Sequence, residues 1–379
     1  MDFFEEVLRK IGNRPLLISS TILAIVFLAN RLLIVRAVSS IASRLYLHTF
    51  VVGATHNPDE PQITVSGLYI HPVKSLRPVS VKFATLDTKG FVDDRRYMLV
   101  TPAPLPAWGS FGSHDPTHRF LTQRQCPSLA TVVAELQDGT LRLSSFKLPN
   151  ESVSISVTPL PGSALYRATL WSDMVQVRDM GEQVAAFMQK LVNQDNAMPD
   201  ELKDSVRVVT QDRRDGRIAD DKYVPASART STGRTPSVAL TDGFPILLAC
   251  EASLDELNRR LQQKGKGSLP MSRFRPNIVL SGTMPFEEDH WKVIAIDGVL
   301  FHIVKGCPRC KQSCTDQQTG DVTDEPLATM AEFRALQPGN KDNLYFAQNV
   351  LSAPGSNRKR ISVGARVQVL QRGDPVWEE

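Results

Sequence analysis

The sequence predicts a β-rich mixed fold, with barrel-type strands and a few helices, preceded by an apolar segment. Three observations lead to this prediction. Short runs of alternating β-branched and polar residues recur along the chain from Ile63 onward. Proline slightly outnumbers glycine, 25 to 22, which favours short elements joined by stiff turns over long helical bundles. Residues 15–29 contain no charged side chain, which is typical of a membrane segment.

Length and charge narrow the class of protein. The chain has 379 residues, enough for about two domains, at roughly 100–200 residues per domain. We expect an anchor and linker at residues 1–55, a first domain at residues 60–195 and a second at residues 205–371. The net charge of +4 is mild, and no long run of lysine and arginine occurs, so nucleic acid is not an expected partner. The sequence also contains no glycine-rich nucleotide loop and no nucleophile elbow.

The apolar segment is predicted to be an uncleaved membrane anchor. The run "PLLISSTILAIVFLA" is uncharged, and Arg31 can snorkel so that the span extends into the following "LLIV". A secretory signal peptide would need a small-residue cleavage site, and a mitochondrial matrix presequence should lack acids such as Asp2. A buried core helix would not normally be followed by a polar linker such as residues 56–62. Basic residues flank both sides, so charge leaves the orientation open.

Alternating runs predict strands through the first half of the soluble part. The clearest run is "ITVSGLYIHPV", which ends at Pro72. Similar runs occupy residues 79–87, 95–102, 130–136, 140–146 and 152–160. An amphipathic helix is predicted at residues 181–194, where four apolar side chains share one face: Val184, Phe187, Met188 and Leu191. The border between the two domains is expected near residues 195–205.

The second half combines a long loop, a helix and further strands. The polar residues 211–236 predict a long loop, and long loops in compact domains are often functional or disordered. A helix is predicted at residues 251–267, because leucines recur three and four positions apart before Gly265. Strands are predicted at residues 275–282, 291–306 and 360–371. Within the second of these, Asp297-Gly298 is a hairpin signal.

The stretch "KGCPRCKQSCTD" holds three of the five cysteines. Cys307 and Cys310 form a C-x-x-C, but a structural zinc site would need a second pair of ligands, which the sequence lacks. A redox pair would open a helix, and the residues after Cys310 begin a helix poorly. A disulfide is a minority interpretation for a cytosolic chain. A single thiolate ligand to a metal that brings its other ligands is the remaining interpretation, and Arg309 and Lys305 are expected to lower the thiol pKa. Two isolated cysteines, Cys126 and Cys250, are expected to pack in apolar surroundings.

Several motifs in order resemble one known family. The segments "RFRPNIVLSG" and "GCPRCKQSCTDQQTG" resemble the MOSC domain, the molybdenum cofactor sulfurase C-terminal domain. The segments "GLYIHPVKSL", "GFVDDRRYMLV" and "FLTQRQCPSLATV" are similar to its β-barrel-like N-terminal partner domain. With the anchor, the chain resembles the mitochondrial amidoxime-reducing component family over residues 60–371. The resemblance implies a MOSC β-barrel domain with helices, a β-barrel-like N-terminal partner domain and a preceding transmembrane helix.

The resemblance also implies a molybdenum cofactor and a set of site residues. The cofactor would be a molybdopterin with molybdenum bound by Cys310, which would also be the catalytic residue, because thiolates suit a sulfur-rich metal sphere. Cys307 would have no required ligand role, and Cys314 would be structural. The cofactor-binding residues implied are Lys74, Ser75, Arg96, Arg275, Asn277, Pro308, Arg309 and Asn349, the last in a late loop that closes over the cofactor. Taken singly, each arginine could instead form a surface ion pair, and Lys74-Ser75 could be a simple turn.

Two departures from the family pattern affect this expectation. Thr283 stands where a second family cysteine is expected, so any role of that cysteine is absent. Residues 242–244, "DGF", replace small hydroxyl residues, so cofactor contacts there are expected from the backbone only.

The implied function is reduction of small N-hydroxylated compounds, such as amidoximes, by two electrons and two protons. No ferredoxin-like cysteine set exists, so electrons are expected from a separate protein. By resemblance these donors are cytochrome b5 and NADH-cytochrome b5 reductase, and the anchor lies in the outer mitochondrial membrane with the enzyme in the cytosol. The alternative is a molybdenum-cofactor carrier or sulfur-transfer protein without reductase turnover. A zinc-stabilised membrane scaffold is a third interpretation, which the missing ligands disfavour.

Overall fold

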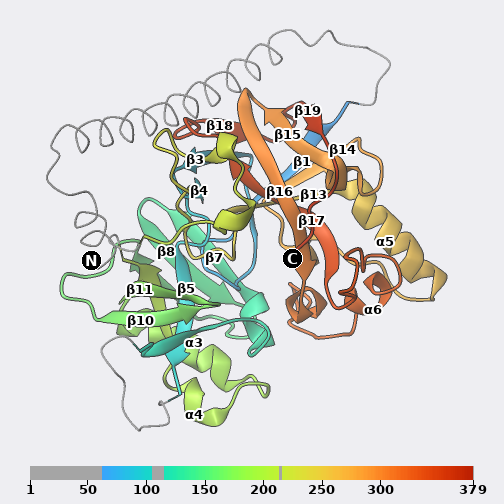
Figure 1. Ribbon diagram of the computed structural model, residues 1–379. Helices are drawn as coiled ribbons and strands as arrows, with labels where there is room; N and C mark the ends of the chain where they lie inside the picture. Colours follow the sequence, from blue (N-terminus) through green and yellow to red (C-terminus); the bar gives the residue numbers. More distant parts are fainter. Residues whose placement is uncertain (1–61, 105–114, 213–215, 379) are drawn as a thin grey trace, which may run out of the picture. The chain divides into compact units, whose positions relative to one another are not determined.

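The computed structural model describes residues 62–104, 115–212 and 216–378 (Figure 1). The predicted anchor and linker, residues 1–55, lie outside these ranges. Across the described ranges, none of the helices has the length and apolar character that crossing a membrane requires.

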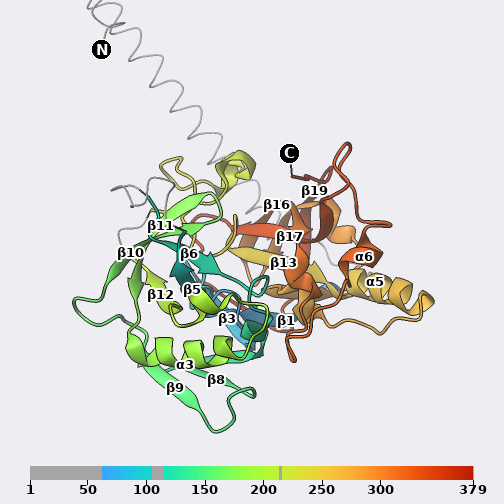
Figure 2. The same ribbon diagram turned by 90° about the horizontal axis from the view of Figure 1, so that it is seen from below.

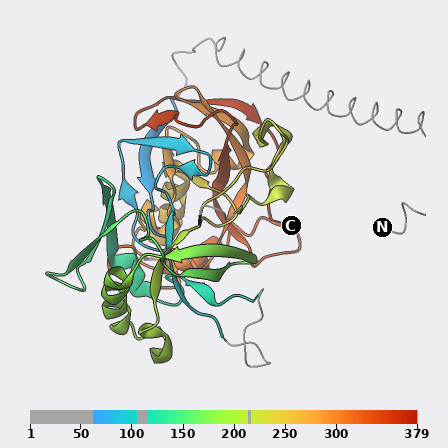
Figure 3. The ribbon, with the colours of Figure 1, turned by 90° about the vertical axis from the view of Figure 1, so that its left-hand side faces the viewer.

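The larger sheet contains eight strands and joins the two ends of the described chain. Its order is β19-β15-β16-β17-β13-β14-β1-β2. All neighbouring pairs are antiparallel except β13 and β14, which are parallel. The strands are β1 (Thr64–Ile70), β2 (Val79–Ser80), β13 (Ile246–Cys250), β14 (Ile278–Ser281), β15 (Trp291–Ile296), β16 (Val299–Arg309), β17 (Leu344–Ser352) and β19 (Val367–Arg372). Figure 3 shows β1, in blue, against the orange and red strands of the C-terminal half.

This sheet curls until its two ends meet. Strand β2 pairs with the end of β1, at Tyr69 and Ile70. The backbone groups at the start of β1 on this edge can therefore bond to residues 364–367. The backbone N–H of Val65 donates to the carbonyl of Ala365 at 2.9 Å, and the N–H of Val367 donates to Ile63 at 2.8 Å. The inner face therefore encloses an apolar core. Trp291, Phe301 and Leu68 are fully buried there.

The second sheet is a closed barrel of five strands in the order β10-β11-β12-β5-β6. Its strands are β5 (Tyr97–Pro102), β6 (His118–Leu121), β10 (Leu165–Leu170), β11 (Asp173–Asp179) and β12 (Arg207–Gln211). The sequence predicts a barrel in each half. The barrel whose strands form a continuous ring of hydrogen-bonded pairs consists mostly of strands from the first half. The eight-stranded sheet closes through the backbone hydrogen bonds to residues 364–367.

Two three-stranded sheets complete the β structure. One contains β18 (Arg360–Ser362), β3 (Phe83–Asp87) and β4 (Gly90–Phe91), and the other contains β7 (Val132–Gln137), β8 (Thr140–Ser145) and β9 (Ser152–Ser156). The α-helices are α3 (Glu182–Asn193), α4 (Asp200–Lys203), α5 (Glu251–Gln263) and α6 (Leu327–Met330). Figures 1 and 2 show α3 beside the barrel strands and α5 beside the strands of the larger sheet.

The two predicted helices and one hairpin agree with the structure, whereas the short helices α4 and α6 were not predicted. Helix α3 buries the four predicted apolar side chains, and α5 buries Leu254, Leu257 and Leu261. Asp297 and Gly298 connect β15 to β16, both with positive φ (48° and 70°), as a two-residue hairpin turn requires. Cys126 and Cys250 are fully buried in two different apolar cores, which confirms their predicted packing role.

Six short 3₁₀ helices lie in the connections between these elements. They are η1 (Pro127–Thr131), η2 (Asp221–Tyr223), η3 (Ala226–Ala228), η4 (Met271–Phe274), η5 (Glu287–His290) and η6 (Lys311–Cys314). Two of them, η2 and η3, lie in the long polar loop that the sequence predicts between residues 211 and 236.

Candidate functional site

A cavity of about 820 Å³ lies where loops of the first half meet the end of β16. Its walls come from the loop after β1, the turn between β10 and β11, residues 217–221, residues 241–247, and the strands β16 and β17. Eight of the nine predicted site residues line it: Lys74, Ser75, Arg275, Asn277, Pro308, Arg309, Cys310 and Asn349. The ninth, Arg96, does not. The structure therefore brings together residues that lie more than 230 positions apart in the sequence.

Cys310 is the exposed thiol of this cavity. Strand β16 ends at Arg309, and Cys310 follows it as the residue that precedes η6. Cys310 is exposed, Cys307 is half-buried and Cys314 is buried, and all five cysteines are free thiols. Within the described ranges, no three His, Cys, Asp or Glu side chains are grouped so that they could hold a metal ion. A metal at Cys310 would thus have to bring most of its other ligands with it.

The charges expected to act on Cys310 have other partners. The Arg309 guanidinium donates to the Sγ of Cys307 at 3.0 Å and to the carbonyl of Phe274 at 2.9 Å. Lys305 Nζ donates to the carboxylate of Glu378 at 2.9 Å. Burial raises the pKa of the Cys307 thiol, and Arg309 opposes that effect only in part. The hydrogen bonds of Arg309 and Lys305 thus go to Cys307, Phe274 and Glu378.

Lys74 and Ser75 form a turn shortly after β1, which ends at Ile70. Lys74 Nζ donates to Asp242 Oδ1 at 2.5 Å, which ties this turn to the loop before β13. Burial lowers the pKa of Lys74, and the Asp242 carboxylate opposes this change. Ser75 has a left-handed backbone (φ 69°), and its hydroxyl is buried without a hydrogen-bond partner. A buried hydroxyl without a partner is costly, so this one is suited to a bound ligand.

Arg95 replaces Arg96 in the cavity wall, which corrects the sequence prediction. Arg96 donates to the Asp87 carboxylate at 2.7 Å and to the carbonyl of Phe91, away from the cavity. Arg95 lines the cavity and donates to Asp94 at 2.6 Å. The reason is local, because Arg95 has a positive φ of 49°, which turns the backbone just before β5 begins at Tyr97.

Arg275 and Asn277 hold the cavity wall together. The Arg275 guanidinium donates to the carbonyl of Leu76 at 2.7 Å and to Gln317 Oε1 at 2.8 Å. Burial, together with the nearby charge of Arg95, lowers the pKa of Arg275 to about 9. Asn277 is fully buried and accepts from the N–H of Leu247 and from Arg95. Through these hydrogen bonds, Arg275 positions the turn at Leu76, and Asn277 positions the start of β13 at Leu247.

Asn349 lies within β17 and not in a loop, which corrects a second expectation. Its amide donates to the carbonyl of Gly306 at 3.4 Å, and it pairs with Lys305 across the β16–β17 ladder. The side chain therefore reaches the cavity from a strand of the larger sheet, which is a more rigid support than a closing loop.

Residues 373–378, which follow β19, return to form another part of the cavity wall. The carbonyl of Val376 accepts from the N–H of Gly306 at 2.8 Å, and the N–H of Glu378 donates to the Tyr345 hydroxyl at 3.0 Å. The Trp377 ring lies 4.7 Å from that of Tyr345. A Cβ atom on Gly306 would lie 2.5 Å from the Trp377 ring, so the close approach requires glycine at this position.

Arg217 and Thr241 are two of the polar cavity residues that the sequence pattern did not single out. Arg217 donates to Asp173 at 2.7 Å and to three carbonyls of one loop at 2.7–2.9 Å: those of Ala239, Thr241 and Asp242. This clamp fixes the loop so that the Thr241 hydroxyl is buried, lines the cavity and has no partner. The polar composition of residues 211–236 indicated a functional loop but gave no sign of which residue in it would face the cavity.

The unpartnered polar atoms test whether a phosphorylated cofactor fits. Three buried atoms of cavity-lining residues have no hydrogen-bond partner: Ser75 Oγ, Thr241 Oγ1 and Arg309 Nε. Lys74 and Arg95 add positive charge to the same walls. Hydroxyls and cations are the groups that bind phosphate in proteins. The residues present therefore fit a phosphate-bearing group whose other end reaches Cys310.

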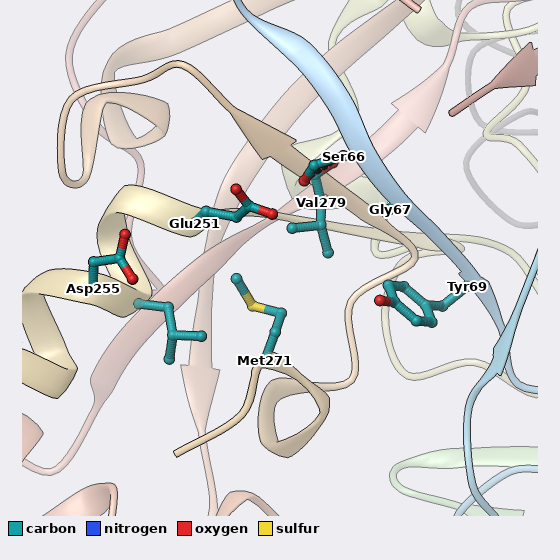
Figure 4. A pocket seen from close by; sticks show the side chains of 8 residues that line it. Ser66, Gly67, Tyr69, Glu251, Asp255, Met271 and Val279 are labelled. Carbon is teal, nitrogen blue, oxygen red and sulfur yellow. Dashed lines mark hydrogen bonds between the residues drawn. The ribbon is translucent and has the colours of Figure 1, made fainter. Parts of the chain in front are cut away.

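A smaller cavity of about 210 Å³ lies elsewhere, between β1, β14 and α5 (Figure 4). Glu251 and Asp255 face it from α5, and Tyr69 and Met271 line it from β1 and η4. No predicted site residue, cysteine, lysine or arginine is among its lining residues. The candidate site is thus confined to the larger cavity.

Comparison with known proteins gives two family matches and several curated relatives. The MOSC N-terminal beta barrel domain matches residues 62–195, and the MOSC domain matches residues 235–376. Mitochondrial amidoxime reducing component 2 of Rattus norvegicus is 31% identical over 320 residues, covering 83% of this chain and 82% of that protein. The protein of the same name from Bos taurus is 28% identical, with 83% of each covered. Molybdenum cofactor sulfurase of Oryza sativa subsp. japonica is 29% identical over 72% of this chain and 31% of that protein.

Proposed function

The chain belongs to the mitochondrial amidoxime reducing component family of MOSC-domain proteins, and on that premise we propose that it is a molybdenum-cofactor-dependent reductase of N-hydroxylated compounds. In the proposed reaction, the N–O bond of an amidoxime breaks. The substrate takes up two electrons and two protons, and the oxygen leaves as water. One observation carries the proposal: the exposed thiol of Cys310 shares a single cavity with buried, unpartnered donors from Ser75, Thr241 and Arg309.

The chain's own residues would hold the cofactor at two ends. Cys310 would be the protein ligand to molybdenum, and Lys74, Ser75 and Thr241 would bind the phosphate. When bound, the cofactor supplies a metal centre that accepts oxygen and exchanges two electrons. Arg275 and Asn277 support the proposal indirectly, because their buried hydrogen bonds fix the bends that carry these ligands.

Electrons would come from a separate protein. The sequence holds five cysteines, and three of them, Cys310 included, lie within residues 307–314, which leaves too few for an iron–sulfur cluster of the ferredoxin kind. We propose cytochrome b5 and NADH-cytochrome b5 reductase as donors, and the outer mitochondrial membrane as the location with the catalytic part in the cytosol. The mitochondrial names of the relatives and the uncharged residues 15–29 support this location.

The proposal is tested with the full chain produced in a host that makes molybdopterin. Molybdenum, pterin and zinc are measured in the purified protein, and benzamidoxime reduction is assayed with cytochrome b5, its reductase and NADH. We expect about one molybdenum per chain, loss of that molybdenum in Cys310→Ala, and its retention in Cys307→Ala. Zinc in place of molybdenum, or equal molybdenum in both variants, would contradict the proposal.

Thr241 offers a second variant that separates binding from stability. Thr241→Val keeps the shape of the side chain and removes the unpartnered hydroxyl. Because that hydroxyl has no partner among the described residues, we expect the melting temperature to stay the same or rise slightly. Pterin retention after dialysis should fall roughly tenfold, the size expected for one lost hydrogen bond to a charged group. A lower melting temperature with unchanged pterin retention would give Thr241 a purely structural role.

A cofactor carrier or sulfur-transfer protein is the second candidate. Its support is the 29% identity to molybdenum cofactor sulfurase, over 31% of that protein. This candidate predicts bound molybdopterin without amidoxime reduction, or a persulfide on Cys310 that mass spectrometry detects. The same purified protein therefore distinguishes the two candidates.

A further inference from the structure

One side of the cavity carries a layered arrangement of cations and aromatic rings. The Arg124 guanidinium lies 4.3 Å from the centre of the Trp171 ring, and that ring lies 5.2 Å from the ring of Phe120. Lys74 Nζ lies 5.8 Å from the centre of the same Phe120 ring. Lys74, Arg124 and Trp171 all line the cavity. Two cations from different segments are thus held beside one pair of aromatic rings.

Trp171 is fixed in a conformation that costs energy. It lies in the two-residue turn between β10 and β11, with a left-handed backbone (φ 58°). For a bulky side chain this conformation costs about 1–2 kcal/mol. The indole Nε1 donates to Asp242 Oδ1 at 2.7 Å, and the same oxygen accepts from Lys74. Because the ring is also half-exposed, burial of an apolar side chain does not account for this arrangement.

Arg124 has donors that no residue of the described chain uses. Its Nε donates to the Thr122 hydroxyl at 3.3 Å, which orients the side chain, and neither terminal nitrogen has a hydrogen-bond partner among the described residues. The side chain is half-buried and faces the cavity. A planar guanidinium with two free terminal nitrogens binds phosphate with two parallel hydrogen bonds. Stacking on an aromatic ring keeps such a guanidinium in place before the ligand arrives.

We propose that Arg124 binds a phosphate monoester in this cavity and that Trp171 positions it. The proposal rests on the function proposed above, since the phosphate is that of the cofactor. Lys74 and Arg124 bind the phosphate from two sides, and the phosphate takes the place of the Asp242 carboxylate as the partner of Lys74. Asp242 keeps its bond to Trp171, so the ring and the guanidinium stay in position when Lys74 changes partner.

The first test measures orthophosphate binding to the full chain purified without molybdenum cofactor, by isothermal titration calorimetry. We expect Arg124→Gln to weaken binding roughly tenfold to a hundredfold, and Arg124→Lys to fall between that variant and the wild type. Arg142→Gln is the matched control, because Arg142 forms an exposed ion pair with Glu135 on β7 and β8, outside the cavity. Equal affinity in Arg124→Gln and wild type would overturn the proposal.

The second test asks whether Trp171 acts through Arg124. Trp171→Ala should weaken phosphate binding in the wild type but add little in the Arg124→Gln background, since its effect requires the guanidinium. Trp171→Phe, which keeps a ring and loses the bond to Asp242, should weaken binding less than Trp171→Ala. Equal effects of Trp171→Ala in both backgrounds would exclude the positioning role.

Pterin retention in the molybdenum-loaded protein separates this proposal from the function on which it rests. If the wild type retains cofactor and Arg124→Gln retains as much, the Arg124 assignment is wrong while the reductase can stand. If the wild type binds orthophosphate but never acquires molybdopterin, the cavity is a phosphate site and the cofactor proposal is wrong. A wild type that binds neither would contradict both.

Discussion

Glu288 is a buried carboxyl that makes the stability of the protein depend on pH. It lies in η5, just before β15, is fully buried, and accepts hydrogen bonds from the Ser253 hydroxyl at 2.7 and 2.9 Å. Burial, reinforced by the neighbouring Asp289, raises the pKa of Glu288 to about 7. The unfolded chain would lose this proton near pH 4.3. Between these two pH values, Glu288 is therefore protonated in the folded protein and ionised in the unfolded chain.

Replacement of Glu288 should remove this dependence. Between about pH 4.5 and 7 the wild type loses stability as the pH rises, because only the unfolded state gains a charge. Glu288→Gln does not titrate, so its free energy of unfolding relative to wild type should rise by on the order of 2–3 kcal/mol across this window and level off above it. Urea unfolding at a series of pH values measures the difference. Glu332→Gln, at an exposed position, is the control, and a parallel pH profile for Glu288→Gln and wild type would contradict the prediction.

At the scale of single residues, the sequence could identify the region of the site but not always the residue. Arg95 and Arg96 are adjacent and chemically identical, and only the positive φ of Arg95 decides which one faces the cavity. Thr241 faces the cavity because Arg217 clamps the loop, and that clamp joins segments more than 20 residues apart. Neither the positive φ of Arg95 nor the long-range hydrogen bonds of Arg217 can be read from the pattern of residues. Cys310, by contrast, was singled out by the family resemblance of its C-x-x-C segment, and the structure places it in the cavity directly after β16.

Segment 373–378 depends on a single glycine of β16. A methyl group at position 306 would overlap the Trp377 ring, so Gly306→Ala should displace this segment from the cavity wall. Overpacking of this kind costs about 1–3 kcal/mol. We expect faster proteolysis after Arg372, measured by mass spectrometry of the fragments, and loss of the contact between Lys305 and Glu378. Gly267→Ala is the control, because a Cβ atom there meets no heavy atom within 4 Å. If Gly306→Ala is cleaved after Arg372 no faster than the wild type, Trp377 can pack against β16 in another conformation and the prediction is wrong.

At the scale of elements, the alternating runs predicted strands well and the uniform runs did not. Strands β7, β8 and β9 have one buried and one more exposed face, which the sequence displays as alternation. All five residues of β13 are buried, and so are most of those of β17. A strand covered on both faces has no alternation to detect, so the sequence analysis missed β13 and placed Asn349 in a loop.

The whole molecule is held together by strands that cross between the two halves of the sequence. Strand β1 pairs with β14, β3 pairs with β18, and β12 closes the barrel of the first half. The domain border near residues 195–205 stays a prediction, and these pairings cross it in both directions. Composition could predict two halves rich in strands. It could not predict which strands pair, because long-range pairing leaves no local pattern.

A chain without its first strands should not fold. A fragment of residues 205–379 lacks β1, which exposes the edge of β14 and removes the core side chains Val65 and Leu68. We expect this fragment to be insoluble or to unfold without a cooperative transition in calorimetry, while residues 62–379 unfold in one transition. Fusion of residues 62–91 to the fragment through a flexible linker should restore solubility. A cooperative transition in the unfused fragment would show that the second half folds independently.

The pairing of β1 with β14 also has a consequence during translation. Ser66 and Val279, which share a hydrogen bond in this pair, lie 213 residues apart. At about 5–20 residues per second, the ribosome needs roughly 10–40 seconds to make the segment between them. For that time β1 leaves the exit tunnel without its partner, and its apolar face and free edge are available to other nascent chains. Faster or slower decoding between residues 70 and 278 should therefore change the yield of soluble protein without changing a single amino acid.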